Sequence, residues 1–183
     1  MVGESMNFLL IGMPGCGKTT FGKNAARRLG LEFVDVDREI VNRENRSINQ
    51  IFADEGEDYF RAVESRVLAD CLKRDRTVIS AGGGIVEIYS NIENAKAAGA
   101  YIIFIDRPLA MITGDIDTSG RPLLKDGVDK LKAIYDRRRD LYFSAADAVV
   151  KNDKGYSSVQ ADLIGCIEYG MEPDTAEAEM SFK

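Results

Sequence analysis

The chain contains no histidine and no tryptophan, and it has three cysteines and four prolines among its 183 residues. Without histidine, acid-base chemistry falls to carboxylates or lysine, and a metal ion has to be held by oxygen ligands. The cysteines, Cys16, Cys71 and Cys166, are too widely spaced to form a metal-binding pair. So few cysteines, odd in number, fit a reducing compartment.

The chain also lacks a long apolar run, and its N-terminus lacks the basic-then-apolar order of a signal peptide. It has 24 basic and 30 acidic residues, and the net charge of −6 argues against a general binder of nucleic acid or of anionic membranes. A chain of this length forms one domain with its own core. We therefore expect a monomeric, cytoplasmic protein that binds any anion through local positive groups.

The sequence does contain a phosphate-binding loop, GMPGCGKT at residues 12–19, between an apolar run at 8–11 and a helical segment at 21–29. The pattern G-x-x-x-x-G-K-[ST] directs backbone N–H groups toward phosphate oxygens, and the following helix adds its dipole. Lys18 is predicted to reach the β- and γ-phosphates, and Thr19 to bind Mg²⁺. A glycine-rich turn is the alternative. The predicted nucleotide-binding residues of this loop are Gly15, Cys16, Gly17, Lys18, Thr19 and Thr20.

Two aspartates end the next strand-like segment, EFVDVD at residues 32–37. Ligands meet an open parallel sheet at the carboxyl ends of its strands. Asp35 is therefore predicted to bind Mg²⁺, and Asp37 to project toward a substrate. The alternative is that both residues only cap the helix that begins at Arg38. Their position one βα unit after the phosphate loop favours a functional role.

The segment at residues 47–61 is predicted to form two short helices hinged at Gly56, with Ser47 as the N-cap of the first. The second helix continues at helical spacing and places Arg61 and Glu64 three residues apart, where they are able to pair. A solvated face is the alternative for this pair. Three glycines at 82–84 then follow an apolar strand, where they allow a ligand to approach the backbone closely; a tight turn is the alternative.

The segment TGDIDTSGRP at residues 113–122 is small and polar and has no apolar periodicity. We predict a mobile lid at about residues 112–124, with Gly114 and Gly120 as hinges and Arg121 at its edge. A helix at 128–143 carries three consecutive arginines that face different directions, so at most two of them can address one site. A solvated face is the usual meaning of such a run.

Five apolar strand candidates alternate with helices along the chain, which predicts an α/β domain with a five-stranded parallel sheet flanked by helices. The domain is expected to span residues 1–170, with substrate-binding helices at about 37–64 and the lid at its periphery. The acidic tail at 171–183 has too little apolar surface to fold alone and is expected to be disordered.

With these features together, the chain resembles the shikimate kinases, small P-loop kinases of aromatic amino-acid biosynthesis. Six stretches occur in the same order: GMPGCGKTT, VDVDREI, IFADEGEDYFR, AGGG, RPLL and RRRDLY. They extend over residues 12–142. The resemblance implies a P-loop kinase fold and the ATP-dependent phosphorylation of shikimate to shikimate 3-phosphate, with Mg²⁺ bound and ADP released. This reaction is a step toward chorismate and the aromatic amino acids.

The resemblance also implies roles on the acceptor side of the site. Arg61 and Arg138 are expected to clamp the carboxylate of shikimate, because a guanidinium fork matches a carboxylate. Arg138 is preferred because it lies four residues before Tyr142, and Arg139 is the alternative. Asp37 is expected to bind the reacting hydroxyl, either orienting it or accepting its proton. Further substrate contacts are expected from Phe52, Phe60, Gly83 and Gly84.

On the donor side, the resemblance assigns Mg²⁺ to Thr19 and Asp35, and catalytic charge neutralisation to Lys18 and to Arg121 of the lid. The lid departs from the family pattern, because residues 112–119 lack the further arginine that often lies near the adenine. We therefore expect the loop around Asn152 to line the adenine side. Two alternatives stay open: a kinase for another hydroxy acid such as gluconate, and a catalytically weak nucleotide-binding module.

Overall fold

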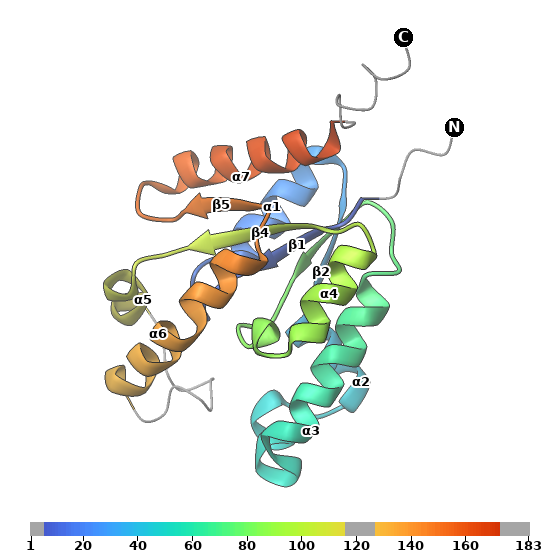
Figure 1. Cartoon of the computed structure of the whole chain (residues 1–183), viewed down its shortest axis with the longest axis vertical. Coiled ribbons are helices and arrows are strands. Elements are labelled where there is room, and N and C mark those ends of the chain that lie inside the picture. Colours follow the sequence, from blue (N-terminus) through green and yellow to red (C-terminus); the bar gives the residue numbers. More distant parts are fainter. Residues whose placement is uncertain (1–5, 116–126, 173–183) are drawn as a thin grey trace.

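Short apolar runs such as Phe8–Ile11 have no polar face, and they form a sheet that is buried on both sides (Figure 1). The structure, a computed structural model, describes residues 6–115 and 127–172. One parallel sheet has the strand order β2-β3-β1-β4-β5, which confirms the predicted five-stranded parallel sheet. The strands are β1 Phe8–Ile11, β2 Glu32–Asp35, β3 Thr77–Ser80, β4 Tyr101–Asp106 and β5 Ala148–Lys151.

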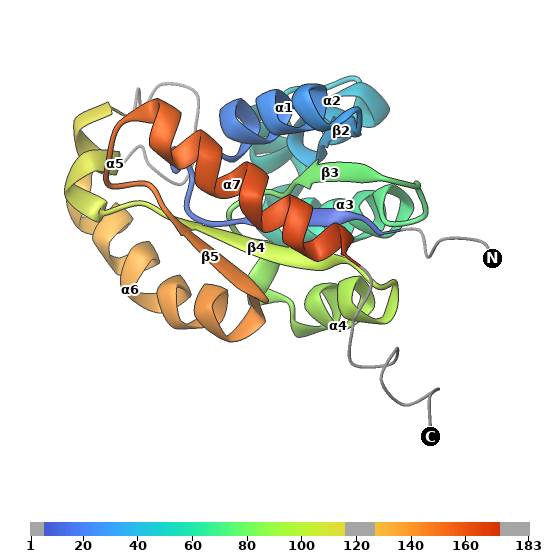
Figure 2. The ribbon, with the colours of Figure 1, turned by 90° about the horizontal axis from the view of Figure 1, so that it is seen from above.

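Helices cover both faces of this sheet. Helices α1 and α7 pack on one face, and α4 and α6 pack on the other, where α3 lies beside α4 (Figures 1 and 2). Within the described ranges, no helix is long and apolar enough to cross a membrane. The helices are α1 Lys18–Leu29, α2 Val36–Glu44, α3 Ile48–Cys71, the 3₁₀ turn η1 Ile85–Glu87, α4 Tyr89–Ala97, α5 Leu109–Asp115, α6 Val128–Ala145 and α7 Tyr156–Met171.

Helix α3 begins and bends where the sequence predicts. Ser47 forms a capping box with Gln50: its hydroxyl accepts from the Gln50 N–H, and the Gln50 side chain accepts from the Ser47 N–H. At Gly56 the backbone leaves the helical conformation with a φ of 81°, which favours glycine. The predicted hinge is confirmed. The part of α3 that follows this kink carries Arg61 and Glu64.

The predicted end of the second strand is wrong. Strand β2 ends at Asp35 rather than Asp37, because the Asp35 carboxylate accepts from the Arg38 N–H at 3.2 Å and starts α2 at Val36. The beginning of the predicted lid is helical, because α5 extends to Asp115 and buries Ile112. The rest of the lid, with Gly120 and Arg121, lies outside the described residues, as does nearly all of the predicted tail.

Because all five strands are parallel, their carboxyl ends meet at one edge of the sheet. Asp35 at the end of β2 is in register with Ser80 at the end of β3, and Asp106 at the end of β4 is in register with Lys151. The loop after β1 enters the same edge, next to both β3 and β4. Ligand sites of open α/β sheets lie at this edge, and the polar residues described below gather there.

Candidate active site

The phosphate loop has the backbone that its glycines allow. Gly12, Gly15 and Gly17 have φ angles of 146°, 79° and 103°, a region that side chains with a β-carbon disfavour. The loop follows β1 directly, and α1 starts at Lys18, so the strand, loop and helix occur in the predicted order. The N-terminus of α1 is therefore presented to an anion at the carboxyl edge of the sheet.

Lys18 is held at the loop itself. Its ammonium group donates to the carbonyls of Gly12 at 2.8 Å and of Met13 at 3.0 Å, and the residue is buried. The side chain of Cys16, which packs beneath Gly12, is also buried, so a contact between Cys16 and a nucleotide has to come from its backbone. The loop thus offers one ammonium charge and several backbone donors to a phosphate group.

Side-chain oxygen atoms line the same cleft as Lys18. The Thr19 hydroxyl donates to Asp35 Oδ2 at 2.6 Å and lies 3.3 Å from the Ser80 hydroxyl. These are the hard donors that Mg²⁺ prefers, and Mg²⁺ usually takes one or two protein oxygens together with phosphate and water. Across residues 6–115 and 127–172 there is no larger cluster of acidic or cysteine side chains suited to a metal. Ser80 was not predicted, although it is the polar last residue of an apolar strand.

A cleft of about 460 Å³ opens over the loop and reaches Asp37. It brings together most of the residues predicted for the donor side, and it adds several that were not predicted. Its predicted members are Gly15, Gly17, Lys18, Thr19, Thr20, Asp35, Asp37, Gly83 and Asn152; its other members are Phe21, Ser80, Ala81, Arg107, Met111, Lys154 and Tyr156.

Two side chains from later in the chain bind the loop's carbonyls. Asn152 donates to the carbonyl of Cys16 at 2.9 Å, and Arg107 donates to the carbonyl of Gly15 at 2.9 Å. Tyr156 stacks on Phe21 with 5.0 Å between ring centroids. Sequence reasoning missed Arg107. The available signal was its position directly after β4, at the edge of the sheet where ligands bind.

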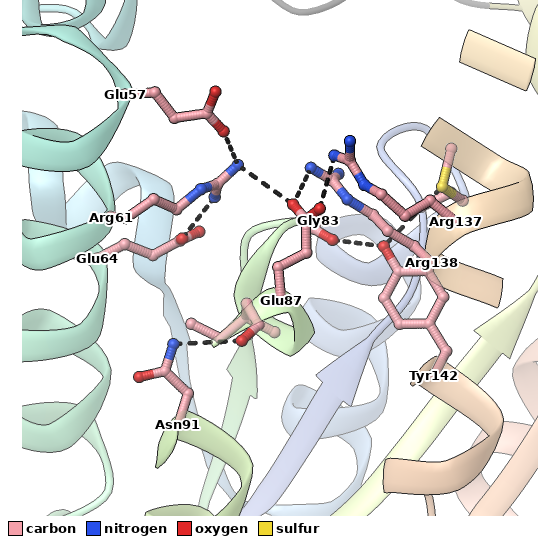
Figure 3. Close-up of polar contacts among 11 residues, drawn as sticks. Glu57, Arg61, Glu64, Gly83, Glu87, Asn91, Arg137, Arg138 and Tyr142 are labelled. Carbon is pink, nitrogen blue, oxygen red and sulfur yellow. Dashed lines mark hydrogen bonds and ion pairs between the residues drawn. The ribbon is translucent and has the colours of Figure 1, made fainter. Parts of the chain in front are cut away.

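The second half of the site is a group of arginines around one carboxylate, which we call the Glu87 cluster: Arg61, Arg137, Arg138 and Glu87 (Figure 3). Glu87 Oε2 lies 2.5 Å from Arg138 and 3.8 Å from Arg61, and Oε1 lies 2.6 Å from Arg137. Arg138 is buried, whereas Arg139 turns to the Phe143 ring at 4.7 Å. Of the two open candidates, the structure therefore places Arg138 beside Arg61.

Arg61 forms ion pairs with two acidic residues of its own helix, α3. Arg61 lies 2.6 Å from Glu64 and 3.1 Å from Glu57, so the predicted Arg61–Glu64 pair is confirmed (Figure 3). Burial, with a contribution from Asp37, raises the pKa of Glu64, and Arg61 opposes this shift. Burial also acts to raise the pKa of Glu87, but the hydrogen bond and charge of Arg138, with Arg137 and Arg61, outweigh burial and lower the pKa.

The three glycines after β3 make room for parts of the protein itself. A β-carbon at Gly82 would overlap Glu64 and lie 3.1 Å from Asp37 Oδ1, and one at Gly83 would lie 2.7 Å from the Pro14 ring. A β-carbon at Gly84 would overlap the Arg61 guanidinium. The glycine turn therefore lets the Asp37 carboxylate, the phosphate loop and Arg61 come close together.

Gly84→Ala is expected to raise the KM for the acid that the family resemblance implies about tenfold or more, because the added methyl group displaces the Arg61 guanidinium and such misplacements are costly. The KM for the nucleotide should change little. Gly165→Ala is the matched control, since a β-carbon there meets nothing within 4 Å. Steady-state kinetics of both variants check this. Equal KM values for this acid in Gly84→Ala and the parent protein would show that Arg61 does not contact it.

Two aromatic rings and a tyrosine complete this region. Phe52 and Phe60 pack with 4.7 Å between centroids, and the Arg61 guanidinium lies 5.3 Å from the centre of the Phe60 ring. The Tyr142 hydroxyl donates to the carbonyl of Gly83 and joins α6 to the glycine turn (Figure 3). The predicted aromatic residues thus lie on the Arg61 side, and neither of them lines the cleft described above.

A phosphate loop at the end of β1, hydroxyl and carboxylate oxygens of Thr19 and Asp35 beside it, and the Asp37 carboxylate in the same cleft define a P-loop kinase. The chain belongs to the shikimate kinase family: the family model described as shikimate kinase matches residues 14–168. It is similar to the shikimate kinase of Clostridium beijerinckii, with 41% identity over 155 residues, 85% of this chain and 90% of that protein.

Solved structures give the same result. The chain is similar to the shikimate kinase from Acinetobacter baumannii in complex with shikimate, with a TM-score of 0.81 and 30% identity over 97% of this chain and 95% of that one. It is also similar to the shikimate kinase from Aquifex aeolicus, with a TM-score of 0.78 and 38% identity over 89% of this chain and 96% of that one. The predicted family and fold are confirmed.

Proposed function

We propose how the residues of this site divide the work of a shikimate kinase, which transfers a phosphoryl group from ATP to a hydroxyl of shikimate. The products are shikimate 3-phosphate and ADP, on the route to the aromatic amino acids. The observation that carries the proposal is that Asp37 lines the same cleft as Lys18 and Thr19 and lies beside the Arg61–Glu64 pair across Gly82. A phosphate donor and an acidic acceptor can therefore be bound next to each other.

On the donor side, the backbone of the loop and the Lys18 ammonium bind the phosphates of ATP. Thr19 and Asp35 would hold Mg²⁺, which neutralises negative charge on the phosphates when it is bound. Asn152 and Arg107 hold the loop through its carbonyls and face the nucleotide side of the cleft. Arg121, outside the described residues, is proposed to complete this side from the lid.

On the acceptor side, Arg61 and Arg138 bind the carboxylate of shikimate, and Asp37 binds the hydroxyl that attacks the γ-phosphorus. Phosphoryl transfer needs alignment and charge neutralisation more than covalent help from the protein. Asp37 therefore acts by orienting the hydroxyl, and it can accept the proton as the bond to phosphorus forms. Phe52 and Phe60 provide an apolar wall for the ring, and Gly83 and Gly84 provide backbone contacts.

Arg61→Ala is expected to raise the KM for shikimate about 30-fold or more, because truncating one partner of a desolvated charge pair costs about 2 kcal/mol or more. The turnover number and the KM for ATP should change much less. Glu64 loses its partner in this variant, so thermal unfolding is measured in parallel, and Arg61→Lys serves as a milder second variant. Arg66→Ala on the exposed side of α3 is the control.

The assay is ADP release in the presence of shikimate, gluconate or no acceptor, with and without Mg²⁺. Dependence on both shikimate and Mg²⁺ is expected. Turnover with gluconate but not with shikimate would overturn the substrate assignment, and an unchanged KM for shikimate in Arg61→Ala would overturn the clamp. A monomer in the cytoplasm, with neither nucleic acid nor membrane as a partner, remains our proposal for the setting of this enzyme.

A further inference from the structure

Glu87 lies between the two arginines that are proposed to clamp the substrate's carboxylate (Figure 3). We propose that Glu87 competes with that carboxylate for Arg61 and Arg138, so that shikimate has to displace it and Glu87 sets the affinity of the enzyme for acids. This inference rests on the proposed clamp. It assigns a specificity-determining role to a residue outside the six stretches that carry the family resemblance.

The geometry around Glu87 is that of a bound carboxylate. One oxygen, Oε2, faces both Arg138 at 2.5 Å and Arg61 at 3.8 Å, which come from different helices. The Arg138 side chain is 1% exposed, so its charge needs a nearby anion, and Glu87 supplies one. Among the described residues, Arg138 Nε has no hydrogen-bond partner, so this guanidinium keeps a buried donor.

The arginines of the region already have carboxyl partners before an acid arrives. Arg61 lies beside Glu57 and Glu64, and Arg137 and Arg138 lie beside Glu87. Glu57 and Glu64 flank Arg61 from its own helix, whereas Glu87 contacts both Arg61 and Arg138. When Glu87 moves away, an incoming carboxylate can therefore bind both Arg61 and Arg138 in its place.

Glu87 has a route by which it can withdraw. It ends the three-residue turn η1, and its side chain is 21% exposed. Its other oxygen lies 2.6 Å from Arg137, whose side chain is 60% exposed. Glu87 can therefore rotate outward and remain paired with Arg137. An acid that has only a carboxylate gains little from this exchange, whereas shikimate also gains contacts through its hydroxyls, so the exchange favours the intended substrate.

Isothermal titration of shikimate into the parent protein and into Glu87→Gln tests the proposal. Glu87→Gln removes the competing charge and keeps the side-chain shape, so the Kd for shikimate is expected to fall about five- to tenfold. The Kd for the uncharged methyl ester of shikimate should stay within about twofold. Glu57→Gln is the matched control: it removes the same charge beside Arg61 but not between the two arginines, and its effect on the Kd should be smaller.

A higher or unchanged Kd for shikimate in Glu87→Gln would overturn the inference. A residue that only positions the arginines would weaken shikimate binding when it is changed, and so would raise the Kd. Equal tightening for the methyl ester would also overturn it. If Glu87→Gln does not fold, Glu87→Asp is used instead. Its shorter carboxylate should lower the Kd for shikimate, but by less than the fall expected for Glu87→Gln. An unchanged or higher Kd in Glu87→Asp counts against the proposal. Failure of Arg61→Ala to weaken shikimate binding would instead overturn the clamp.

Discussion

Asp37→Asn is expected to lower kcat for shikimate phosphorylation about 10²- to 10⁴-fold, the range for loss of a positioned acid-base group. The Asp37 carboxylate lines the cleft with Lys18 and Thr19, where an acceptor hydroxyl and the γ-phosphate have to meet. An amide keeps the size of the side chain but loses the negative charge that we propose orients the hydroxyl or accepts its proton. The KM for ATP should change little, because Asp37 lies on the acceptor side.

The measurement is a coupled assay of ADP release with both substrates varied. Glu39→Gln is the control, because it removes a carboxylate from the same helix at a residue that does not line the cleft. Thermal unfolding of both variants checks the fold. If Asp37→Asn turns over shikimate at the parent rate, the acceptor hydroxyl binds elsewhere and the proposed division of the site is wrong.

Lys18→Met is expected to lower kcat/KM for ATP about 10²- to 10³-fold, the usual effect of removing one preorganised donor from a site of charge development. Methionine retains most of the length of the side chain and loses the ammonium charge. The change also removes the hydrogen bonds to the carbonyls of Gly12 and Met13, so the loop itself loses two contacts. Both effects act on the phosphates, and the affinity for shikimate should be affected less.

Lys23→Met, on an exposed position of the same helix, is the control for this change. ATP binding is measured by titration without shikimate, and turnover by ADP release. A Lys18→Met protein that binds ATP and turns over like the Lys23→Met protein would contradict the assignment of Lys18. A loss of turnover with parent-like thermal unfolding would place the defect at the phosphates rather than in the fold.

The donor half of the site was predictable because its residues are contiguous. Loop geometry is set by local backbone preferences, so glycines at fixed spacing before Lys18 and Thr19 define a phosphate site wherever a strand precedes and a helix follows. The hinge at Gly56 and the cap at Ser47 were predictable for the same reason. The strand boundary at Asp35 was misplaced, because an aspartate can end a strand and begin a helix, and the alternation of residues 32–37 does not distinguish the two.

The clamp of Arg61 and Arg138 and the aromatic contacts of Phe52 and Phe60 were predictable only through the family resemblance, and parts of the acceptor half were not predicted. Glu87 is a single acidic residue after an apolar pair, and no local pattern marks it. Arg107 and Ser80 likewise matter through neighbours that are distant in sequence. The glycines at 82–84 were expected to admit a ligand, and the structure shows that each of them makes room for a protein group.

The sequence by itself determined the parallel α/β sheet, the phosphate loop and the set of charged residues from which an acid site can be built. The sheet follows from apolar periodicity and the loop from short-range backbone geometry, and both act within a few residues. The tertiary structure decided that Arg138 rather than Arg139 lies beside Arg61, and that Glu87 lies between Arg61 and Arg138. Successive residues of a helix point in different directions, so only the packing of α6 against η1 and β4 selects the one that enters the site.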